Sequence, residues 1–348
     1  MSGVVKNPRT ELVGVCDIDA DRARKAGSEY DATWYTDLDE LLTVEDVEWL
    51  HVCTPVQTHL ELATKAIQAG IPVLIEKPVT ETLDELEELA ASAERHDVRV
   101  TAVHNQLYMP AVREARERIH AGEIDEVLGI DLVFAGMTRP DDPNRGSWTF
   151  DLPGGEFEEG LPHSIYLTLE LGGFPADASG ISATTTLRGE YEQDFTYDEV
   201  GFQYVTEAGT ICSGTMRPDP VPQRSITVHG GDTSLLLDSI SHTVVTLDRE
   251  YDTSAIARAL KSFDHSTDRI RGVARNSVLF AKSMLRDDWG LKKATNSHYY
   301  LFDEEVSAIK RGSKGRDNLE RARWAMQILE SIRESAGGRV ETVPETTP

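Results

Sequence analysis

Residues 72–78 read PVLIEKP, a short run of aliphatic side chains followed by a charged pair and a second proline. An apolar run of this length between turn residues is typical of a buried β-strand. Similar runs lie at residues 11–17, 48–53 and 98–103. Segments with helical periodicity alternate with them, at residues 19–29, 58–68, 82–96 and 110–120. This alternation predicts βαβ units around a parallel sheet, the architecture of a Rossmann-like α/β domain.

The pattern changes at residues 121–122. Between residue 127 and about residue 247 most segments read as strands, with one helix at residues 163–171. Consecutive strands without intervening helices predict a mostly antiparallel sheet. Helices are predicted again at residues 254–286, 302–311 and 318–336. We therefore predict a Rossmann-like domain over residues 1–121, an α+β domain over residues 122–337 and a disordered polar tail over residues 338–348.

Acidic residues dominate the charge of the chain. The sequence holds 60 Asp and Glu against 35 Lys and Arg, a formal net charge of −25, and only 10 of the basic residues are Lys. Such a surface suits a cytoplasm of very high salt, where ions screen the self-repulsion. The lack of a basic stripe argues against nucleic-acid binding. No apolar run reaches the ~20 residues of a membrane helix and no signal-peptide core is present, so we expect a soluble cytoplasmic protein.

One element of a dinucleotide-binding domain is missing from the sequence. Such a domain normally begins with a strand, a G-x-G-x-x-G turn and a helix, and an acidic residue further on binds the ribose hydroxyls. Asp17 fits the acidic residue, but no G-x-G-x-x-G occurs. The missing strand is usually central, so the runs at 11–17 and 48–53 would each lose a ladder partner. We expect the natural protein to start upstream of Met1; the alternative is a variant that has lost its cofactor site.

Three further segments carry chemistry. CTPVQTH at residues 53–59 and EKP at residues 76–78 each follow a predicted strand, and GGEFEEGLPH at residues 154–163 leads into a helix. Together with Asp17 they resemble the glucose–fructose oxidoreductase/inositol dehydrogenase (Gfo/Idh/MocA) family, and the likeness extends to HYYLF at residues 298–302. The resemblance implies an NAD(P)-dependent dehydrogenase of sugars or polyols. It also implies an open-faced sheet domain, through which such proteins often form homodimers or homotetramers.

The resemblance also implies roles for individual residues. Lys77 would lie between nicotinamide and substrate, and His163 would act as acid or base with Glu159 as its acidic partner. Glu159 replaces the usual Asp, and Tyr166 stands where Asp is common, so the substrate is less well defined than the reaction. The chemistry agrees, because hydride removal from a secondary alcohol needs a base for the hydroxyl proton and a cation near the oxygen.

Further residues are expected to contact the cofactor or the substrate. For the cofactor we expect Asp17, Thr54, Pro55, His59, Glu76 and Pro78. For the substrate we expect Asn105, Tyr108 and Tyr166. Asp17 favours NAD, since a carboxylate binds a ribose 2′-hydroxyl and repels a 2′-phosphate, whereas Arg22 and Arg24 keep NADP possible.

Several of these residues also have structural explanations. Lys77 could be a solvated charge, His163 a structural histidine, and Glu159 a helix N-terminal acid. His59 could pack its helix, and Asn105 and Tyr108 could shape a turn. The loop at 137–155, with Arg139, Arg145, Trp148 and Phe150, could face substrate or form a packed surface connection. A metal site at Glu158, Glu159 and His163 is disfavoured, because there is one histidine and no third well-placed ligand. Cys16, Cys53 and Cys212 form no C-x-x-C pair and are expected in the core.

Two other functions stay open. The chain could be a non-catalytic sugar- or partner-binding relative that has lost the dinucleotide loop. It could also use bound NAD to cleave glycosides through transient oxidation, with the same Lys77 and His163.

Overall fold

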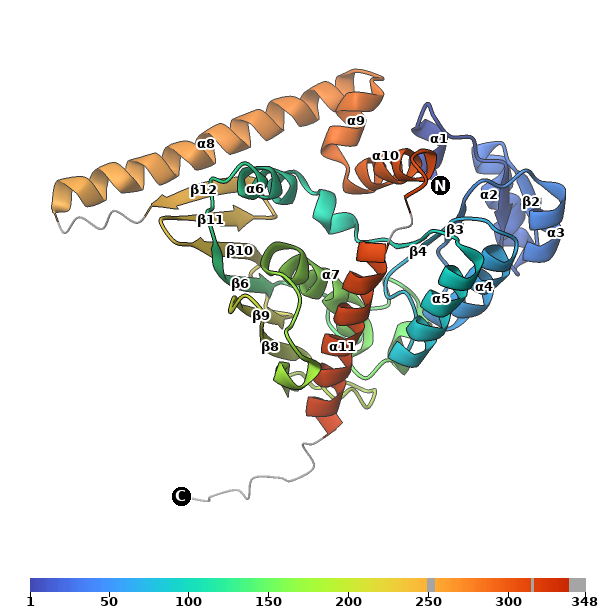
Figure 1. The fold of residues 1–348 in the computed structure, drawn as a ribbon, viewed down its shortest axis with the longest axis horizontal. Helices are drawn as coiled ribbons and strands as arrows, with labels where there is room; N and C mark the ends of the chain where they lie inside the picture. The colour runs from blue at the N-terminus through green and yellow to red at the C-terminus, as the bar shows by residue number, and fades with distance from the viewer. Residues whose placement is uncertain (249–253, 314–315, 338–348) are drawn as a thin grey trace. The chain divides into compact units, whose positions relative to one another are not determined.

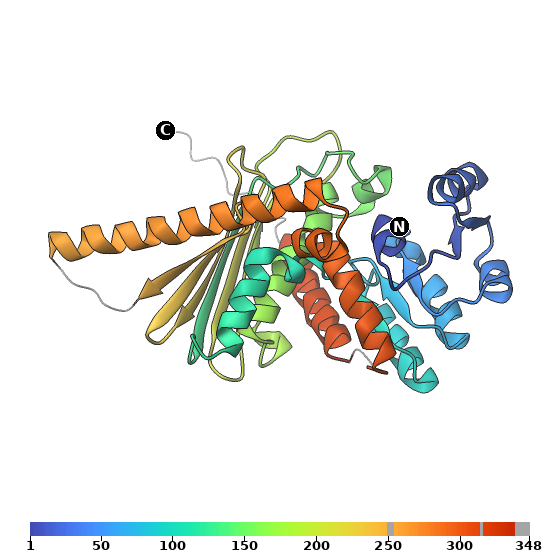
Figure 2. The same ribbon diagram turned by 90° about the horizontal axis from the view of Figure 1, so that it is seen from above.

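A computed structural model describes residues 1–248, 254–313 and 316–337 (Figures 1 and 2). The chain divides into two compact units, each built from two stretches of sequence. Unit 1 contains Met1–Pro110 and Ala274–Arg323, and unit 2 contains Ala111–Val273 and the residues from Trp324 on. The sequence predicts one boundary near residue 121 and does not anticipate that residues 274–323 join the N-terminal unit. The predicted tail at 338–348 lies outside the described residues.

Unit 1 alternates short parallel strands with helices. In chain order its elements are α1 (Ser2–Lys6), β1 (Gly14–Cys16), α2 (Ala20–Tyr30), β2 (Thr33–Tyr35), α3 (Leu38–Val44), β3 (Leu50–Val52), α4 (His59–Gln68), β4 (Val73–Ile75), α5 (Leu83–His96), β5 (Val100–Ala102), α9 (Trp289–Thr295) and α10 (Ser297–Lys310). A capping box begins α5, because Thr82 accepts from Glu85 N while the Glu85 side chain accepts from Thr82 N. Local sequence patterns do not predict β2, α3 and α9, which have only three to seven residues each.

The parallel strands of unit 1 form two sheets. β1 pairs with β2, and β3, β4 and β5 pair in that order, so that Val52, Ile75 and Ala102 lie side by side. β1 and β3 are therefore both edge strands among the described residues. This confirms the prediction that residues 11–17 and 48–53 would each lack one ladder partner.

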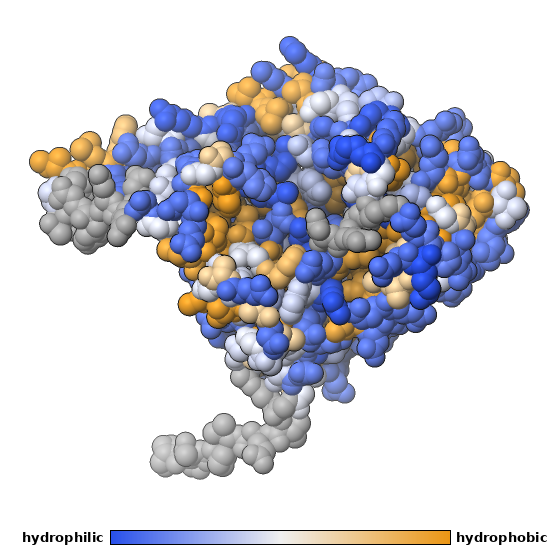
Figure 3. Space-filling view, in the orientation of Figure 1, coloured by the Kyte–Doolittle hydropathy of each residue, from blue (hydrophilic) through white to orange (hydrophobic). Residues whose placement is uncertain are grey.

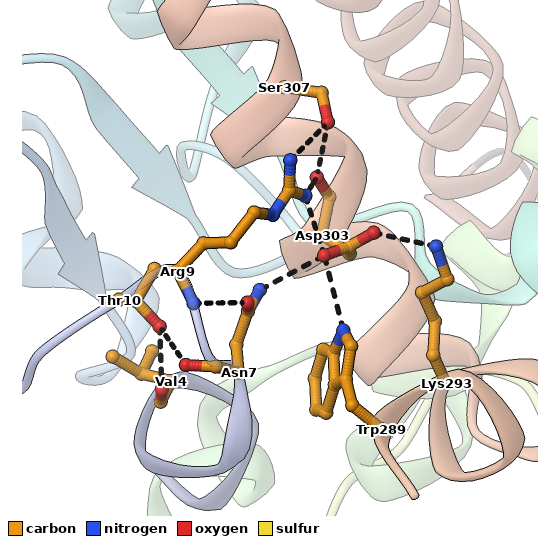
Figure 4. A network of polar contacts seen from close by, with 8 residues as sticks. All are labelled: Val4, Asn7, Arg9, Thr10, Trp289, Lys293, Asp303 and Ser307. Carbon is orange, nitrogen blue, oxygen red and sulfur yellow. Dashed lines mark hydrogen bonds and ion pairs between the residues drawn. The ribbon is translucent and has the colours of Figure 1, made fainter.

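A buried carboxylate ties the N-terminal segment of unit 1 to α9 and α10 (Figure 4). Asp303 accepts from Asn7 Nδ2 at 3.3 Å, Trp289 Nε1 at 3.3 Å and Lys293 Nζ at 2.6 Å, and it pairs with Arg9. Burial alone raises the pKa of Asp303, but these donors outweigh it and hold the pKa below its usual value. Charge-assisted bonds of this kind are the stronger ones.

A second ion pair joins α10 to Arg99, directly before the start of β5. Both Glu305 oxygens accept from Arg99, at 3.0 Å from Nε and 2.9 Å from Nη2. Both side chains are nearly inaccessible, at 10% and 6% exposure. Leu301 and Phe302 of α10 also pack against Leu74 and Val103. These contacts explain why residues 289–310 belong to unit 1.

Unit 2 is built on one seven-stranded sheet. Its elements are α6 (Pro110–His120), β6 (Val127–Ala135), α7 (Gly155–Gly172), β7 (Ser182–Thr186), β8 (Glu199–Val205), β9 (Ile211–Arg217), β10 (Gln223–Gly230), β11 (Thr233–Asp238) and β12 (Thr243–Asp248). The strand order is β12-β11-β10-β6-β9-β8-β7, and every pair is antiparallel except β6–β9. Two long helices, α8 (Ala255–Leu285) and α11 (Arg316–Gly337), have residues in both units.

The two faces of this sheet differ in polarity. Ile130, Leu132 and Phe134 of β6 are buried on the face that α7 covers. The opposite face carries polar groups, since Asp131 accepts from Ser213 Oγ at 2.6 Å and lies 2.8 Å from His229 Nε2. The predicted fold class, a parallel Rossmann-like sheet followed by a mostly antiparallel open-faced sheet, is confirmed.

Two local predictions need correction. The helix predicted at 163–171 begins at Gly155 and continues through Pro162, because α7 is buried on nearly all sides and packing outweighs the proline. Cys212 is buried as expected, but Cys16 is half-buried and Cys53 is exposed, since Cys53 follows the last residue of β3. No helix in the described ranges combines the length and the apolar composition needed to cross a bilayer.

Buried histidines make the stability pH-dependent. His104 is 3% exposed, and burial holds its pKa well below the usual value, so the unfolded chain binds a proton that the folded chain does not. Burial also lowers the pKa of His59 and His242. We predict that the free energy of unfolding falls as pH drops below about 6.5, measured by denaturant titration at constant high salt.

Carboxylates also titrate at low pH, so the test compares two substitutions. His104→Asn should flatten the dependence between about pH 5 and 6.5, where the histidine contribution lies. His120→Asn, at an exposed histidine, should leave it unchanged. An unaltered slope in His104→Asn contradicts the prediction.

Candidate active site

Polar side chains follow the parallel strands of unit 1 at their carboxyl ends. Asp17 follows β1, Thr54 follows β3, Lys77 follows β4 and His104 follows β5. Because β3, β4 and β5 are parallel neighbours, the last three positions share one edge of their sheet. Ligands of open α/β sheets bind at this edge.

Asp17 presents a half-exposed carboxylate at the end of β1, with its side chain 35% exposed. Its Oδ1 accepts from Asp19 N at 2.9 Å and from Arg22 Nη2 at 3.0 Å. The contacts end on one oxygen, so Oδ2 is placed to accept from a hydroxyl group. Arg24 pairs with Asp21 one turn along α2.

His59 lies at the junction of the loops that follow β3 and β4. Its ring is 1% exposed, with Nε2 2.8 Å from the Thr54 carbonyl and Nδ1 3.1 Å from the Pro78 carbonyl. Burial lowers the pKa of His59, and the carbonyl contacts oppose this only in part. The arrangement supports the packing explanation of His59 rather than contact with a cofactor. Thr54 and Pro55 are exposed beside it.

Lys77 is buried, with 7% of its surface exposed, directly after β4. The preceding Glu76 donates its N–H to the Val52 carbonyl at 2.9 Å, which holds the turn against β3. Its carboxylate lies 3.5 Å from His51 Nε2. Burial raises the pKa of Glu76, but His51 and other nearby positive groups outweigh it and lower the pKa. His51 was not predicted as a site residue, because it stands within an apolar strand.

Asn105 and Tyr108 contact α10. Asn105 Nδ2 lies 3.4 Å from Ser297 Oγ and 3.5 Å from His298 Nδ1. The rings of Tyr108 and Tyr300 stack at 5.6 Å between centroids. Both residues therefore connect the turn after β5 to the segment 297–300, which carries part of the resemblance stated above.

In unit 2, α7 carries the predicted acid–base residue. His163 is half-buried, and its Nδ1 lies 2.7 Å from the hydroxyl of Tyr166. Tyr166 is fully buried, which suits it to orient His163; its expected contact with substrate stays a prediction. Glu159 stands one turn before His163 and thus on the same face of the helix.

The three glutamates before His163, at positions 156, 158 and 159, make different contacts. Glu158 is buried and accepts from Gly154 N at 2.9 Å, Tyr197 Oη at 2.6 Å and Arg333 Nε at 2.8 Å. Tyr197 and Arg333 are remote in sequence and could not be found from a local motif.

The other two carboxylates meet the loop at 137–155. Arg145 N donates to Glu156 at 3.3 Å, and the Arg145 side chain lies 3.7 Å from Glu159. Burial, followed by the charge of Glu159, raises the pKa of Glu156. Trp148 Nε1 donates to the Arg145 carbonyl at 3.0 Å. Arg145 therefore contacts the predicted acidic partner of His163, which gives the loop a part in the site of unit 2.

The residues present fit the two ends of a nicotinamide dinucleotide. A half-exposed carboxylate after β1 suits the adenosine ribose, and a buried lysine after β4 suits the nicotinamide side. The sequence holds no G-x-G-x-x-G turn that would bind the pyrophosphate. Residues of this chain are therefore assigned only to the two ends of the dinucleotide.

A Rossmann-type unit with these groups at its strand ends is joined in sequence to a unit built on a mostly antiparallel sheet. Residues 2–104 match the model of the Gfo/Idh/MocA group, described as an oxidoreductase family with an NAD-binding Rossmann fold. Over these residues the chain is similar to this family.

Relatives support the assignment. The uncharacterized oxidoreductase YhhX of Escherichia coli (strain K12) is 34% identical over 118 residues, which are 32% of this chain and 34% of YhhX. The chain thus aligns with about a third of that relative's length.

Solved structures share the fold over nearly the whole chain. The UDP-N-acetylglucosamine 3-dehydrogenase of Acidithiobacillus ferrooxidans matches with a TM-score of 0.69 and 19% identity, covering 96% of this chain and 93% of that one. The WlbA dehydrogenase of Bordetella pertussis, solved with NADH and UDP-GlcNAcA, matches with a TM-score of 0.72 and 15% identity, covering 97% and 91%. At these identities the likeness shows the fold.

The Glu158–Arg333 pair should support unit 2. Arg333→Ala leaves a buried carboxylate without its cation, which costs about 3–5 kcal/mol in the free energy of unfolding. Arg323→Ala on the same helix removes an exposed pair with Glu87 and should cost about 0–1 kcal/mol. Denaturant unfolding of both variants tests the difference, and equal losses would contradict the assigned role of Glu158.

Proposed function

We propose that the protein is an NAD-dependent dehydrogenase that transfers hydride between nicotinamide and a secondary alcohol of a sugar, polyol or related compound. The family match over residues 2–104 supports the cofactor class. The sugar nucleotides named for the two structural neighbours support a carbohydrate-type substrate. The observation that carries the proposal is the buried Lys77 directly after β4, within the matched region.

Residues of unit 1 bind and orient in this proposal. The Asp17 carboxylate accepts from the adenosine ribose hydroxyls, and its negative charge favours NAD over NADP. Bound NAD would supply the hydride acceptor. The Lys77 ammonium donates to the reacting oxygen and stabilises the negative charge that develops there. Thr54, Pro55, Glu76 and Pro78 are proposed as further cofactor contacts, whereas His59 holds their loops.

Residues of unit 2 move the proton. If His163 Nδ1–H donates to the Tyr166 oxygen, then Nε2 has a lone pair that accepts the hydroxyl proton of the alcohol. Glu159, on the same face of α7, stabilises the resulting imidazolium. We further propose a homo-oligomer in a cytoplasm of high salt, in line with the formal charge of −25.

The rival functions differ in testable ways. A non-catalytic relative would bind a sugar without NADH, and the two separate sheets of unit 1 are the observation that favours it. The family match and the intact Asp17, Lys77 and His163 support the enzyme instead. Cleavage through transient oxidation would release a cleaved glycoside with no net formation of NADH, so product analysis separates it.

Lys77→Met should lower turnover by about 10²–10⁴-fold, because the developing alkoxide loses its cation. The assay is NADH formation with the best alcohol from a screen of sugars and polyols. Lys65→Met is the matched control, since Lys65 pairs on the surface with Asp39 and should not affect turnover. Normal turnover in Lys77→Met contradicts the catalytic assignment.

Tyr166→Phe should leave KM nearly unchanged and lower kcat by about tenfold, because His163 loses the group that sets its tautomer. The limb of the pH profile of kcat/KM that reports the titration of the catalytic base should shift as well. Tyr197→Phe is the control, since it removes a buried hydroxyl 2.6 Å from Glu158 and should change stability without moving that limb. Identical pH profiles in wild type and Tyr166→Phe would rule out the positioning role.

A further inference from the structure

The helix α8 exposes an unusual number of large apolar side chains. Ile256, Phe263, Ile270 and Met284 are 76%, 69%, 69% and 72% exposed. Leu260, Val273, Val278, Phe280 and Leu285 are also exposed. Hydrophobic surface is visible at the N-terminal end of α8 in the space-filling view (Figure 3). Single exposed apolar residues are ordinary, but nine on one helix form a patch that needs an explanation.

Five of the nine exposed residues, Ile256, Leu260, Phe263, Ile270 and Met284, follow the spacing of a helix seam. Ile256, Leu260, Phe263, Thr267, Ile270 and Ala274 are separated by alternating steps of four and three, and the alternation continues through Ser277 and Ala281 to Met284. Such spacing places one stripe along one side of a helix and is typical of helix–helix packing.

The opposite side of α8 is already packed. Asp268 accepts from the backbone N–H of Thr246 in β12 at 3.3 Å. Gly272 lies against Thr243, where an added Cβ would approach Thr243 Cγ2 to 2.8 Å. The helix therefore covers the edge strand of the unit 2 sheet with one side and directs its apolar stripe outward.

The size of the whole exposed apolar patch on α8, the stripe and its apolar neighbours, fits a protein partner. Nine side chains with these exposures present on the order of 1,000 Å², whereas one partner of a stable interface contributes about 800 Å² and the largest patch of a monomer is about 300–600 Å². A helix of 31 residues is about 46 Å long, which allows a continuous contact.

Charge along one flank of the stripe indicates which partner. α8 holds six Lys or Arg and two Asp, a formal charge of +4 in a chain of −25. On the flank, Asp264 lies in the first half, and Arg271, Arg275 and Lys282 lie in the second. Two copies that pair antiparallel about the middle of α8 bring Asp264 of one beside Arg275 of the other. An anionic membrane would gain nothing from Asp264.

We propose that α8 is a self-association surface, through which two copies of this chain pair their apolar stripes in antiparallel orientation about a two-fold axis. Such an isologous contact is self-complementary and closes as a dimer. It is separate from the open sheet face that the sequence resemblance implies as an interface. Both can coexist, in which case α8 joins two dimers.

The test is sedimentation velocity of the full chain in high salt over a concentration series. Phe263→Glu should raise the concentration for half-association at least tenfold, or remove one association step where a second interface exists. The neighbouring exposed Ser262 provides the control, since Ser262→Glu adds the same charge beside the stripe and should associate like wild type. Circular dichroism confirms that both variants are folded.

Orientation is tested by a charge exchange. Asp264→Arg alone should weaken association, and adding Arg275→Asp should restore it, because the exchanged charges meet again across an antiparallel pair. The proposal is overturned if wild type is monomeric, if Phe263→Glu associates like wild type, or if the double variant is no stronger than Asp264→Arg. It is also overturned if Phe263→Glu leaves sedimentation unchanged but abolishes flotation with anionic vesicles.

Discussion

The ring of His59 holds together the two loops on which the unit 1 site depends. Carbonyl groups from the loops after β3 and β4 lie on either side of it, and burial favours the neutral ring. A neutral ring has one N–H, so it donates to one loop and packs against the other. Thr54 and Pro78 are thereby held near one another, and Lys77 directly precedes Pro78. The segment CTPVQTH thus holds a scaffold residue next to residues of the candidate site.

The motif at 154–163 combines support and chemistry in the same way. Glu158 accepts hydrogen bonds from three donors inside unit 2, including Arg333, which is distant in the sequence. Glu159, one residue later, stays beside Arg145 and shares a face of α7 with His163. Adjacent glutamates therefore have different roles because the helix turns them toward different surroundings.

The fold class followed from local sequence patterns, because period and turn signals in residues 11–103 and 127–247 agree with the tertiary structure. The capping box at Thr82 and the lack of pairing between β1 and β3 were predictable for the same reason. Long-range contacts were not predictable from local patterns. Arg99 pairs with Glu305, and Asn7 with Asp303, because tertiary packing brings together residues that are far apart in the sequence. Tyr166 was predicted to contact substrate because of its position in a motif. Its burial and its contact with His163 favour a positioning role.

The most direct test of the proposed function is equilibrium binding of NADH and NADPH to the full chain, measured by calorimetry in high salt. The proposal predicts binding of NADH with one site per chain and at least tenfold weaker binding of NADPH. Asp17→Asn should abolish this preference, because the carboxylate that distinguishes the two ribose groups is removed. Binding of a sugar ligand without binding of either dinucleotide would contradict the dehydrogenase and favour the non-catalytic relative.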